Sequence, residues 1–249
     1  MLRFLEPKFI QYIKVKMYPV DPQSFKSTKL SAERGDAQAQ LYVGMAYESG
    51  EFAGKNSVES TRWLKLSAEQ GNSIAQYLLA VNYDNGIGIS QDQVQALSWF
   101  RKSAEQGYAD AQYCLGVFYE EGEVLPQDLS RAFKYYESAA KGGSLDAQFN
   151  LGNCYLNGEG VAKDSDKAAA WFAIAAGRGD APSQFNLSQI SKEDSQILFW
   201  ALVCASNGGE FLEQSKPVIC YVVGRLSPAK IEECKRDAEA LIIEIKKCI

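Results

Sequence analysis

The chain has 249 residues, of which 46% are apolar, so it can bury a substantial core and does not have the composition of a disordered chain. Its 26 Lys and Arg stand against 31 Asp and Glu, and the formal net charge of −5 argues against nucleic acid or an anionic membrane as the main partner. No stretch approaches the roughly 18 consecutive apolar residues of a membrane-spanning helix, so no transmembrane segment is expected.

The first 21 residues are rich in apolar side chains, with basic residues scattered among them. A secretory signal would instead place its basic residues before an uninterrupted apolar run. We therefore expect residues 1–21 to form an N-terminal arm or cap, and the protein to be cytoplasmic, or periplasmic if a signal sequence has been removed. Residues 22–34 are predicted to be a lone second helix, because Ser27 and Ala32 match columns of the repeat that follows. The scattered basic residues are Arg3, Lys8, Lys14 and Lys16.

From residue 35 onward, the sequence repeats itself every 36 residues. Four columns of identical residues recur at this spacing without slippage, and chance does not align four columns in phase over so many copies. The sequence therefore predicts a tandem array. The recurring positions are Gly35, Gly71, Gly107, Gly143 and Gly179; Gln40, Gln76, Gln112, Gln148 and Gln184; Tyr47, Tyr83, Tyr119 and Tyr155; and Gly50, Gly86, Gly122 and Gly158.

Each repeat predicts two helices. The first starts after the column glycine, where a capping side chain accepts a free backbone N–H, and ends at a second glycine that adopts a left-handed conformation cheaply. Tyr108 is the exception among the capping positions. The second helix buries an aromatic pair such as Trp99–Phe100, and all four tryptophans share one column that is predicted to be core. The expected caps are Asp36, Asn72, Ser144 and Asp180 for first helices, and Asn56, Asp92, Asp128 and Asp164 for second helices.

A single helical hairpin of this size cannot cover its own apolar face, so consecutive hairpins are expected to stack into an all-α solenoid. The pattern "A-Q-x-x-L-G-x-x-Y-x-x-G", followed by "D-x-x-x-A-x-x-W-F" and "A-A/S-x-x-G", resembles the Sel-one-like repeat, a relative of the tetratricopeptide repeat. The resemblance covers about residues 27–208. It implies a right-handed α-solenoid superhelix of antiparallel helix pairs.

Six cysteines are present without a Cys-x-x-Cys pair, and histidine is absent, so no metal site is expected. Some extracellular proteins of the resembled family staple each repeat with a disulfide. The matching positions here look like Ala68 with Ala75 and Ala104 with Ala111, so the resemblance implies that the staple is missing. This departure favours a reducing compartment and six free thiols.

The array is predicted to end near residue 208. The fifth repeat keeps Gln184 but loses its loop glycine, and Trp200 then resumes the second-helix column. After Gly209 the pattern is lost until Ser227 and Pro228, which predict the start of an amphipathic helix. We expect three segments: an N-terminal arm or cap at residues 1–21, the repeats at 22–208 and a C-terminal helical cap at 209–249. The alternative for the C-terminal helix is that it binds a partner.

Catalytic chemistry has little support in the sequence. Without histidine, the most common general base and the Ser–His and Cys–His arrangements are missing. Neighbouring carboxylates such as Glu120 and Glu121 point about 100° apart on a helix, which is typical of a solvated face. The loops "NGIGIS" and "NGEGVAK" lack the Lys-Ser/Thr ending of a phosphate loop. We expect no enzyme, no cofactor and no catalytic residue.

The remaining candidate site is a surface on the first helices, which line the concave side of helical-repeat superhelices. Three positions of each first helix share one face: the residue after the column glutamine, the residue four further on, and the residue about one turn beyond that. We call this face the first-helix stripe. Its aromatic column has two interpretations, an exposed ladder of binding anchors or rings packed between adjacent helices. The candidate partner-binding residues are Tyr77, Val81, Asp84, Tyr113, Val117, Glu120, Phe149 and Phe185.

These observations favour a non-catalytic protein–protein interaction scaffold, since helical arrays create extended surfaces and aromatic anchors supply most interface energy. Proteins similar to this one in bacteria act as adaptors and regulators. Others are immunity proteins that neutralise a secreted antibacterial toxin such as a phospholipase, which is the alternative function. A hydrolase is the least favoured class. The acidic stripe positions predict a protein partner with a basic patch, and nucleic acid is not expected.

Overall fold

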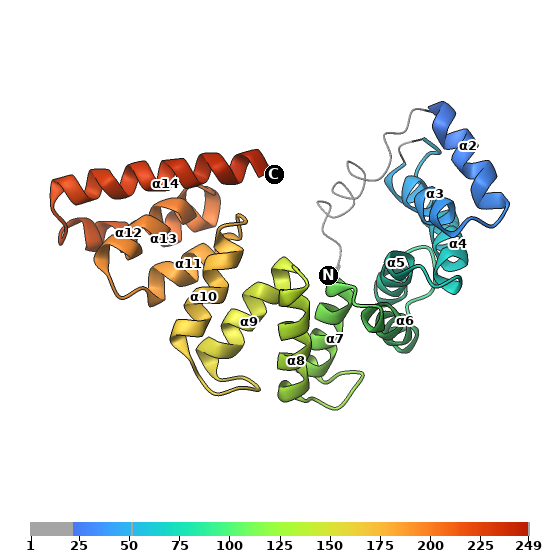
Figure 1. Cartoon of the computed structure of the whole chain (residues 1–249), viewed down its shortest axis with the longest axis horizontal. Coiled ribbons are helices and arrows are strands. Elements are labelled where there is room, and N and C mark those ends of the chain that lie inside the picture. The colour runs from blue at the N-terminus through green and yellow to red at the C-terminus, as the bar shows by residue number, and fades with distance from the viewer. Residues whose placement is uncertain (1–21, 51, 249) are drawn as a thin grey trace. The chain divides into compact units, whose positions relative to one another are not determined.

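The computed structural model describes residues 22–50 and 52–248, and these residues form helices without any strand (Figure 1). The all-α repeat fold is thereby confirmed. The expected N-terminal arm, residues 1–21, lies outside the described residues. The chain divides into two compact units, Met1–Asp128 and Leu129–Ile249. The division falls inside the repeats, and the organisation into three segments stays a prediction.

The first unit contains a lone second helix, two complete helix pairs and one further first helix, and each helix packs on the next one along the chain. The lone second helix expected at residues 22–34 is confirmed as α2, which packs on α3. The helices are α2 (Pro22–Glu33), α3 (Ala37–Ser49), α4 (Ser57–Glu69), α5 (Ser73–Asn85), α6 (Gln93–Glu105) and α7 (Ala109–Glu121).

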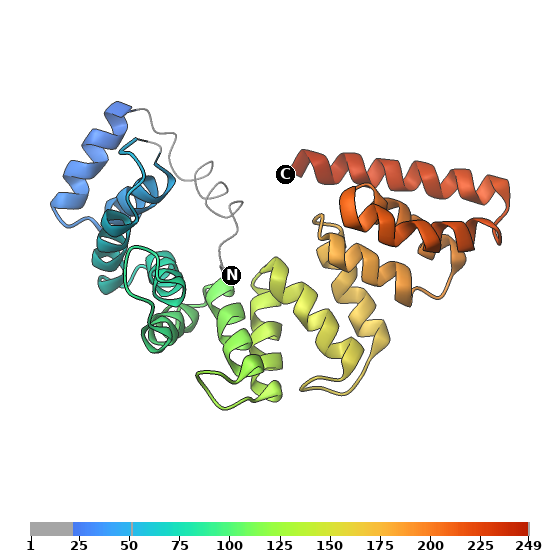
Figure 2. The same cartoon turned by 180° about the vertical axis from the view of Figure 1, so that it is seen from behind.

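The second unit continues the same pattern up to α12, on which both α13 and α14 pack. Both overall views show α14 running past α12 (Figure 2). The predicted amphipathic C-terminal helix is α14, and Ser227 Oγ accepts the backbone N–H of Lys230 at its start. Helix α13 was not predicted, because Pro217 interrupts its sequence. The helices are α8 (Leu129–Lys141), α9 (Leu145–Asn157), α10 (Ser165–Ala176), α11 (Ala181–Ile190), α12 (Asp194–Ala205), α13 (Gly209–Val223) and α14 (Pro228–Cys248).

Capping residues set the helix boundaries much as the sequence predicts. Asp36, Asn72 and Asp180 each accept a backbone N–H three residues on, at 2.7, 3.0 and 2.9 Å. Ser144 and Tyr108 precede α9 and α7 without such a bond. The four glycines that end α3, α5, α7 and α9 have φ between +70° and +82°, where glycine is strongly favoured; they are Gly50, Gly86, Gly122 and Gly158.

The core of α6, α8 and α10 is built on an aromatic pair, and in α6 and α10 the deeper member is not the tryptophan. Phe100 and Phe172 are fully buried. Trp63 and Trp99 are buried as predicted, whereas Trp171 and Trp200 are only half-buried, so the prediction of four core tryptophans was wrong for these two. Adjacent helical residues point about 100° apart, so a pair cannot bury both rings equally.

One position of each first helix holds a small residue, which lets the second helices approach closely; these residues are Gly44, Ala80, Gly116, Gly152 and Ser188. A Cβ atom at Gly152 would lie 2.5 Å from the Phe172 ring, and one at Gly44 would lie 2.9 Å from the Leu64 side chain. Real Cβ atoms do not come this close. Glycine at these two positions therefore leaves the space that the side chains of Phe172 and Leu64 fill in the core.

The column glutamines join consecutive helix pairs. Each donates its Nε2–H to an alanine carbonyl of the preceding second helix at 3.0–3.3 Å, as Gln76 does to Ala68. Within each unit, the Oε1 atom accepts from a residue that lies just after the end of the following second helix. These donors are Gln70, Gln106, Arg178 and Asn207, at 2.7, 2.7, 2.9 and 2.8 Å.

A second column of donors supports the same junctions. Ser67 and Ser103 each donate a hydroxyl hydrogen bond of 2.7 Å to the first carbonyl of the preceding first helix, and the Cys204 thiol makes the equivalent contact at 3.7 Å. At the junction between α7 and α8, the sequence has Ala139 and Gly142 at these two positions, and neither side chain can donate. The division between the compact units falls at this junction.

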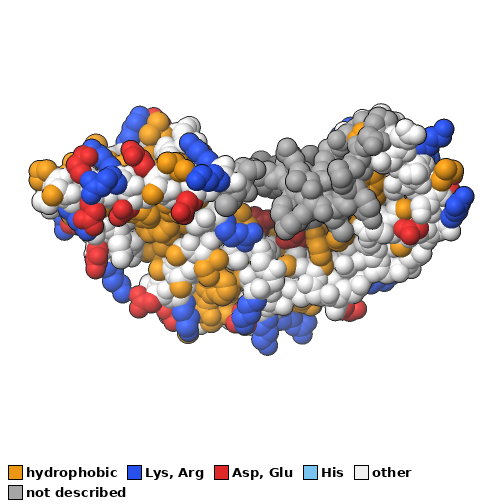
Figure 3. All heavy atoms as spheres, turned by 45° about the horizontal axis from the view of Figure 1, so that its top comes forward, with side chains coloured by type: hydrophobic (Ala, Val, Ile, Leu, Met, Phe, Trp, Pro, Cys, Tyr) orange, Lys and Arg blue, Asp and Glu red, His pale blue; other side chains and the backbone are white. Residues whose placement is uncertain are grey.

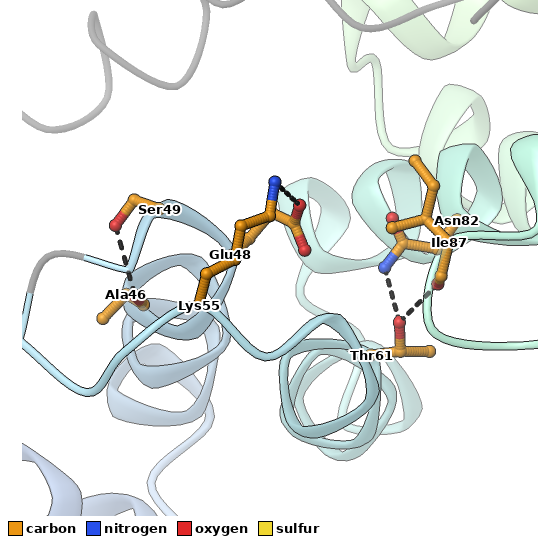
Figure 4. A network of polar contacts seen from close by, with 7 residues as sticks. All are labelled: Ala46, Glu48, Ser49, Lys55, Thr61, Asn82 and Ile87. Atoms are coloured by element: carbon orange, nitrogen blue, oxygen red, sulfur yellow. Dashed lines mark hydrogen bonds and ion pairs between the residues drawn. The ribbon is translucent and has the colours of Figure 1, made fainter.

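The glycine-rich loops between helices hold close backbone contacts. Thr61 Oγ1 donates to the Ile87 carbonyl at 2.9 Å and accepts from Asn82 Nδ2 at 2.8 Å (Figure 4). This network holds the loop so near α4 that a Cβ atom at Gly88 would lie 2.0 Å from the Ser57 carbonyl oxygen. Gly160 approaches the Leu129 carbonyl in the same way. These glycines have a packing role.

The five cysteines whose side chains are described are all thiols in the structure. Burial raises the pKa of the Cys204 and Cys234 thiols above the ordinary value. A thiol that stays protonated is a poor nucleophile and oxidises slowly. Buried cysteines therefore serve as small core residues here.

Replacing Phe172 by alanine should cost about 3–5 kcal/mol of unfolding free energy, as large deletions in a packed core do. The matched control is Trp171→Ala, which removes the half-buried neighbour and should cost distinctly less. Urea unfolding followed by circular dichroism measures both. Equal losses would show that burial does not distinguish the two rings.

Replacing Gly88 by alanine should destabilise the chain more than Gly54→Ala. Both glycines have positive φ, +66° and +67°, so both substitutions carry backbone strain of about 1–2 kcal/mol. Only the Cβ at residue 88 meets another backbone segment, since nothing lies within 4 Å of the one at residue 54. Thermal melting of the two variants isolates the cost of the close contact, and identical melting temperatures would contradict it.

All six cysteines should be titratable in freshly purified protein under denaturing, non-reducing conditions. The expectation follows from the alanines at the staple positions and from the five thiols described. A reduced and alkylated sample provides the baseline. The loss of two or more thiols would instead indicate a disulfide and an oxidising compartment.

Candidate protein-binding surface

The first-helix stripe occurs on α3, α5 and α7 in the first unit and on α9 and α11 in the second. Helical spacing places its three columns on one face of each helix. The structure gives the stripe a different character in each unit. Both units carry aromatic rings in the stripe, but among the described stripe residues only those of the first unit include carboxylates.

On α5, the stripe residues are buried. Tyr77 is 7% exposed, and its ring centroid lies 5.9 Å from that of Phe100 and 5.2 Å from that of Tyr108. Val81 is fully buried, and Asp84 is 3% exposed. At this repeat the packing interpretation of the aromatic column holds, because the Tyr77 ring lies against neighbouring rings.

Tyr108, the one exception among the predicted capping residues of the first helices, packs against Tyr77 with ring centroids 5.2 Å apart. Burial, and to a lesser extent the negative charge of Asp110, raises the pKa of the Tyr108 phenol far above its ordinary value. The ring therefore stays neutral and functions as a packing group. On α7, Val117 is buried, while Tyr113 and Glu120 are half-buried.

On α3, the stripe is also largely buried, with Leu41 and Met45 in the core. Its acidic member is Glu48, whose Oε1 atom lies 3.4 Å from Lys55 Nζ (Figure 4). The Oε2 atom of Glu48 is buried, and no described residue donates a hydrogen bond to it. This carboxylate thus retains an unused acceptor, which is a costly arrangement unless a cation or donor reaches it.

In the second unit, the stripe residues Phe149 and Phe185 are half-buried. One side of the Phe149 ring packs on the core ring Phe172, with centroids 5.9 Å apart. Asn186 Nδ2 donates to Asn153 Oδ1 at 3.4 Å, which links α11 to α9 beside these rings. Space-filling Figure 3 shows several apolar patches on the visible face of the second unit.

Apolar exposure on α13 and α14 was not anticipated from the sequence. Leu212, Tyr221 and Val223 on α13 are exposed, Tyr221 at 64%, and so is Ile243 on α14. The repeat pattern gives no signal here, because these helices lie beyond the last column match and Pro217 hides the helical periodicity of α13.

The described residues do not include a group of three or more His, Cys, Asp or Glu side chains arranged to hold a metal ion. Among the helices that the structure describes, none combines the length and the apolar character needed to cross a bilayer. The features that the structure does bring together are therefore packing rings, buried carboxylates and exposed apolar side chains.

Several solved structures share this architecture. A Sel1 repeat protein from Oxalobacter formigenes is 23% identical, with a TM-score of 0.71 over 88% of this chain and 99% of its own. The protective antigen c5321 of uropathogenic Escherichia coli is 26% identical, with a TM-score of 0.59 over 94% of this chain and 60% of its own. The immunity protein Pa5087 from Pseudomonas aeruginosa is 20% identical, with a TM-score of 0.50 over 93% of this chain and 85% of its own.

No curated protein matches the chain by sequence. The Sel1 repeat model matches four consecutive segments, residues 37–72, 73–108, 109–144 and 145–180. Each segment begins at the first residue of a first helix and spans the helix pair that the glutamine column joins to its neighbours. With the family pattern present over more than half of its length, the chain belongs to the Sel1 repeat family.

Proposed function

We propose that this chain is a non-catalytic scaffold that binds a partner protein through its first helices, with Phe149 and Phe185 of the second unit as anchors. The observation that carries the proposal is that these two rings are half-buried at equivalent positions of consecutive repeats. Repeated half-exposed aromatic side chains are typical of binding surfaces, since large rigid rings dominate interface energies.

The packing of Phe149 on Phe172 favours binding for an entropic reason. A ring already held on one side by a buried neighbour has little conformational freedom left to lose when a partner covers its other side. The rest of its surface is apolar and gains from removal of water. The second unit thus offers preorganised contact area rather than flexible side chains.

The first unit contributes less to this proposed contact. Of the candidate residues there, Tyr77, Val81, Asp84 and Val117 are buried, while Tyr113 and Glu120 are half-buried. We therefore propose Tyr113 and Glu120 as the first-unit contacts, with Glu120 steering a basic patch of the partner. We also propose a cytoplasmic location, because the family's staple positions here are alanines such as Ala68 and Ala75.

Neutralisation of a secreted antibacterial toxin, such as a phospholipase, is the second candidate function. The supporting observation is that the Pseudomonas immunity protein shares the fold over nearly the whole length of both chains. At 20% identity this likeness concerns the fold alone. The identity of the bound partner therefore distinguishes an immunity protein from an adaptor. A captured toxin whose activity is blocked on binding would favour the immunity role, and a regulatory or enzymatic partner would favour the adaptor role.

Once a partner has been captured and identified, Phe149→Ala should weaken its binding by about 2 kcal/mol or more, which corresponds to roughly 30-fold in Kd. The matched control is Ile174→Ala, which removes an exposed apolar side chain from α10 in the same unit and should leave Kd unchanged. Calorimetry with both variants makes the comparison, after melting curves confirm that each is folded.

The opposite pattern would overturn the proposed surface. If Ile174→Ala weakens binding and Phe149→Ala does not, the partner contacts the second helices instead. A Phe185→Ala variant provides an independent check. It changes the equivalent position on α11 and leaves the contact between Phe149 of α9 and Phe172 of α10 in place.

A further inference from the structure

The two first helices of the second unit, α9 and α11, are nearly uncharged. In their sequences, Asp146 in the first turn of α9 is the one charged residue, whereas charged residues make up 23% of the whole chain. The centres of protein interfaces are depleted in charged residues and enriched in aromatic ones. With Phe149 and Phe185 half-buried on them, α9 and α11 have the composition of such a centre.

In place of charges, α9 and α11 carry amide side chains at positions where the first unit has none. Asn150 and Asn186 occupy equivalent positions of consecutive repeats, as do Asn153 and Gln189, and none of the four is buried. Because the first unit packs the same kind of helix pairs without amides here, the repeat fold does not require them. The equivalent first-unit residues are half-buried Tyr42 and the buried Leu78, Cys114, Met45, Val81 and Val117.

These amides have unused hydrogen-bonding capacity. Asn186 Nδ2 donates to Asn153 Oδ1 at 3.4 Å, which is longer than the usual range of about 2.7–3.2 Å and makes the bond weak. The side-chain amide of Asn150 has no hydrogen-bond partner among the described residues. Since each primary amide offers two N–H donors and a carbonyl acceptor, most of these groups remain available to a ligand.

Amide side chains match the backbone of an extended peptide better than that of a helix. A helix satisfies its own N–H and C=O groups, whereas an extended chain presents one donor and one acceptor per residue. Its side chains alternate between two faces, so that every second one can contact the rings. A charged side chain of the ligand would lose hydration here without gaining an opposite charge, which excludes charge from the contact.

We propose that the partner element bound by α9 and α11 is an extended, uncharged peptide segment. Its apolar side chains contact Phe149 and Phe185. Its backbone N–H and C=O groups pair with the side-chain amides of Asn150, Asn153 and Asn186. The inference rests on the proposed function, because it names the chemistry of what the second-unit surface binds.

Selection from a display library of random peptides tests the proposal on the full-length chain. Peptides of about 12 residues suffice, since they span roughly 40 Å when extended. Enriched peptides should be depleted in Lys, Arg, Asp and Glu relative to the unselected library. Fluorescence anisotropy then gives the Kd of a synthetic enriched peptide. This Kd should differ by less than about twofold between low and high salt, because the contact contains no charge pairs to screen.

Variants of the asparagines test the pairing with the peptide backbone. Asn150→Ala and Asn153→Ala should each raise the Kd about fivefold, the factor that corresponds to one net hydrogen bond. Methylating the backbone nitrogens of the peptide one at a time should identify an N–H that binding needs. Combining that methylation with the matching asparagine variant should cost less than the product of the separate effects, because both remove the same hydrogen bond.

The matched control is Gln196→Ala, which removes an exposed amide from α12 in the same unit. It should leave the Kd unchanged. Melting curves of all variants should match that of the wild-type chain, since the substituted amides lie outside the core.

The outcomes separate this inference from the proposed function. Two results would overturn the inference and leave the ring surface in place: enriched peptides that are charged yet lose affinity in Phe149→Ala, or a Kd that responds to Phe149→Ala but to no asparagine variant and no methylation. Enriched peptides that bind equally well to Phe149→Ala and Phe185→Ala would contradict the ring surface itself. A library that yields no peptide above background on the wild-type chain would also overturn the inference.

Discussion

The structure depends on the buried glutamine that joins each helix pair to the next. A buried primary amide is stable only if its donor and its acceptor are both satisfied. Gln76 meets both needs by donating to Ala68 behind it and accepting from Gln106 ahead of it. Because the two partners belong to different second helices, the amide fixes the register between consecutive pairs as well as satisfying itself. Conserving its hydrogen bonds requires the 36-residue spacing seen in the sequence.

The same constraint accounts for where the chain divides. Arg178 and Asn207 continue the contact to the glutamine in the second unit, but the corresponding residue at the junction of α7 and α8 is Gly142. With Ala139 in place of the serine donor, this junction has neither side-chain donor of the other junctions. Helix pairs within a unit are cross-linked by polar contacts, and the division of the chain falls where the sequence lacks both of these side-chain donors.

The first-helix stripe shows how one repeat pattern supports two kinds of surface. Where the stripe carries carboxylates, it belongs mostly to the interior of the unit: Asp84 is buried, and Glu48 is half-buried with Lys55 3.4 Å from its Oε1 atom. Where it carries phenylalanine, as at Phe149 and Phe185, it stays half-buried and offers apolar contact area. A scaffold built in this way keeps its packing residues constant and varies its recognition residues from repeat to repeat.

The sequence by itself determined the helix pairs, their caps and the stacking fold, because each of these follows from residues within one repeat or at a fixed spacing from it. It correctly left the aromatic column open between packing and exposure. Tertiary structure decided that Tyr77 is buried against Tyr108 while Phe149 is only half-buried, and that Trp171 is shallower than Phe172. Burial depends on which side chains neighbouring helices bring to a position, and periodicity records only the face on which a residue lies.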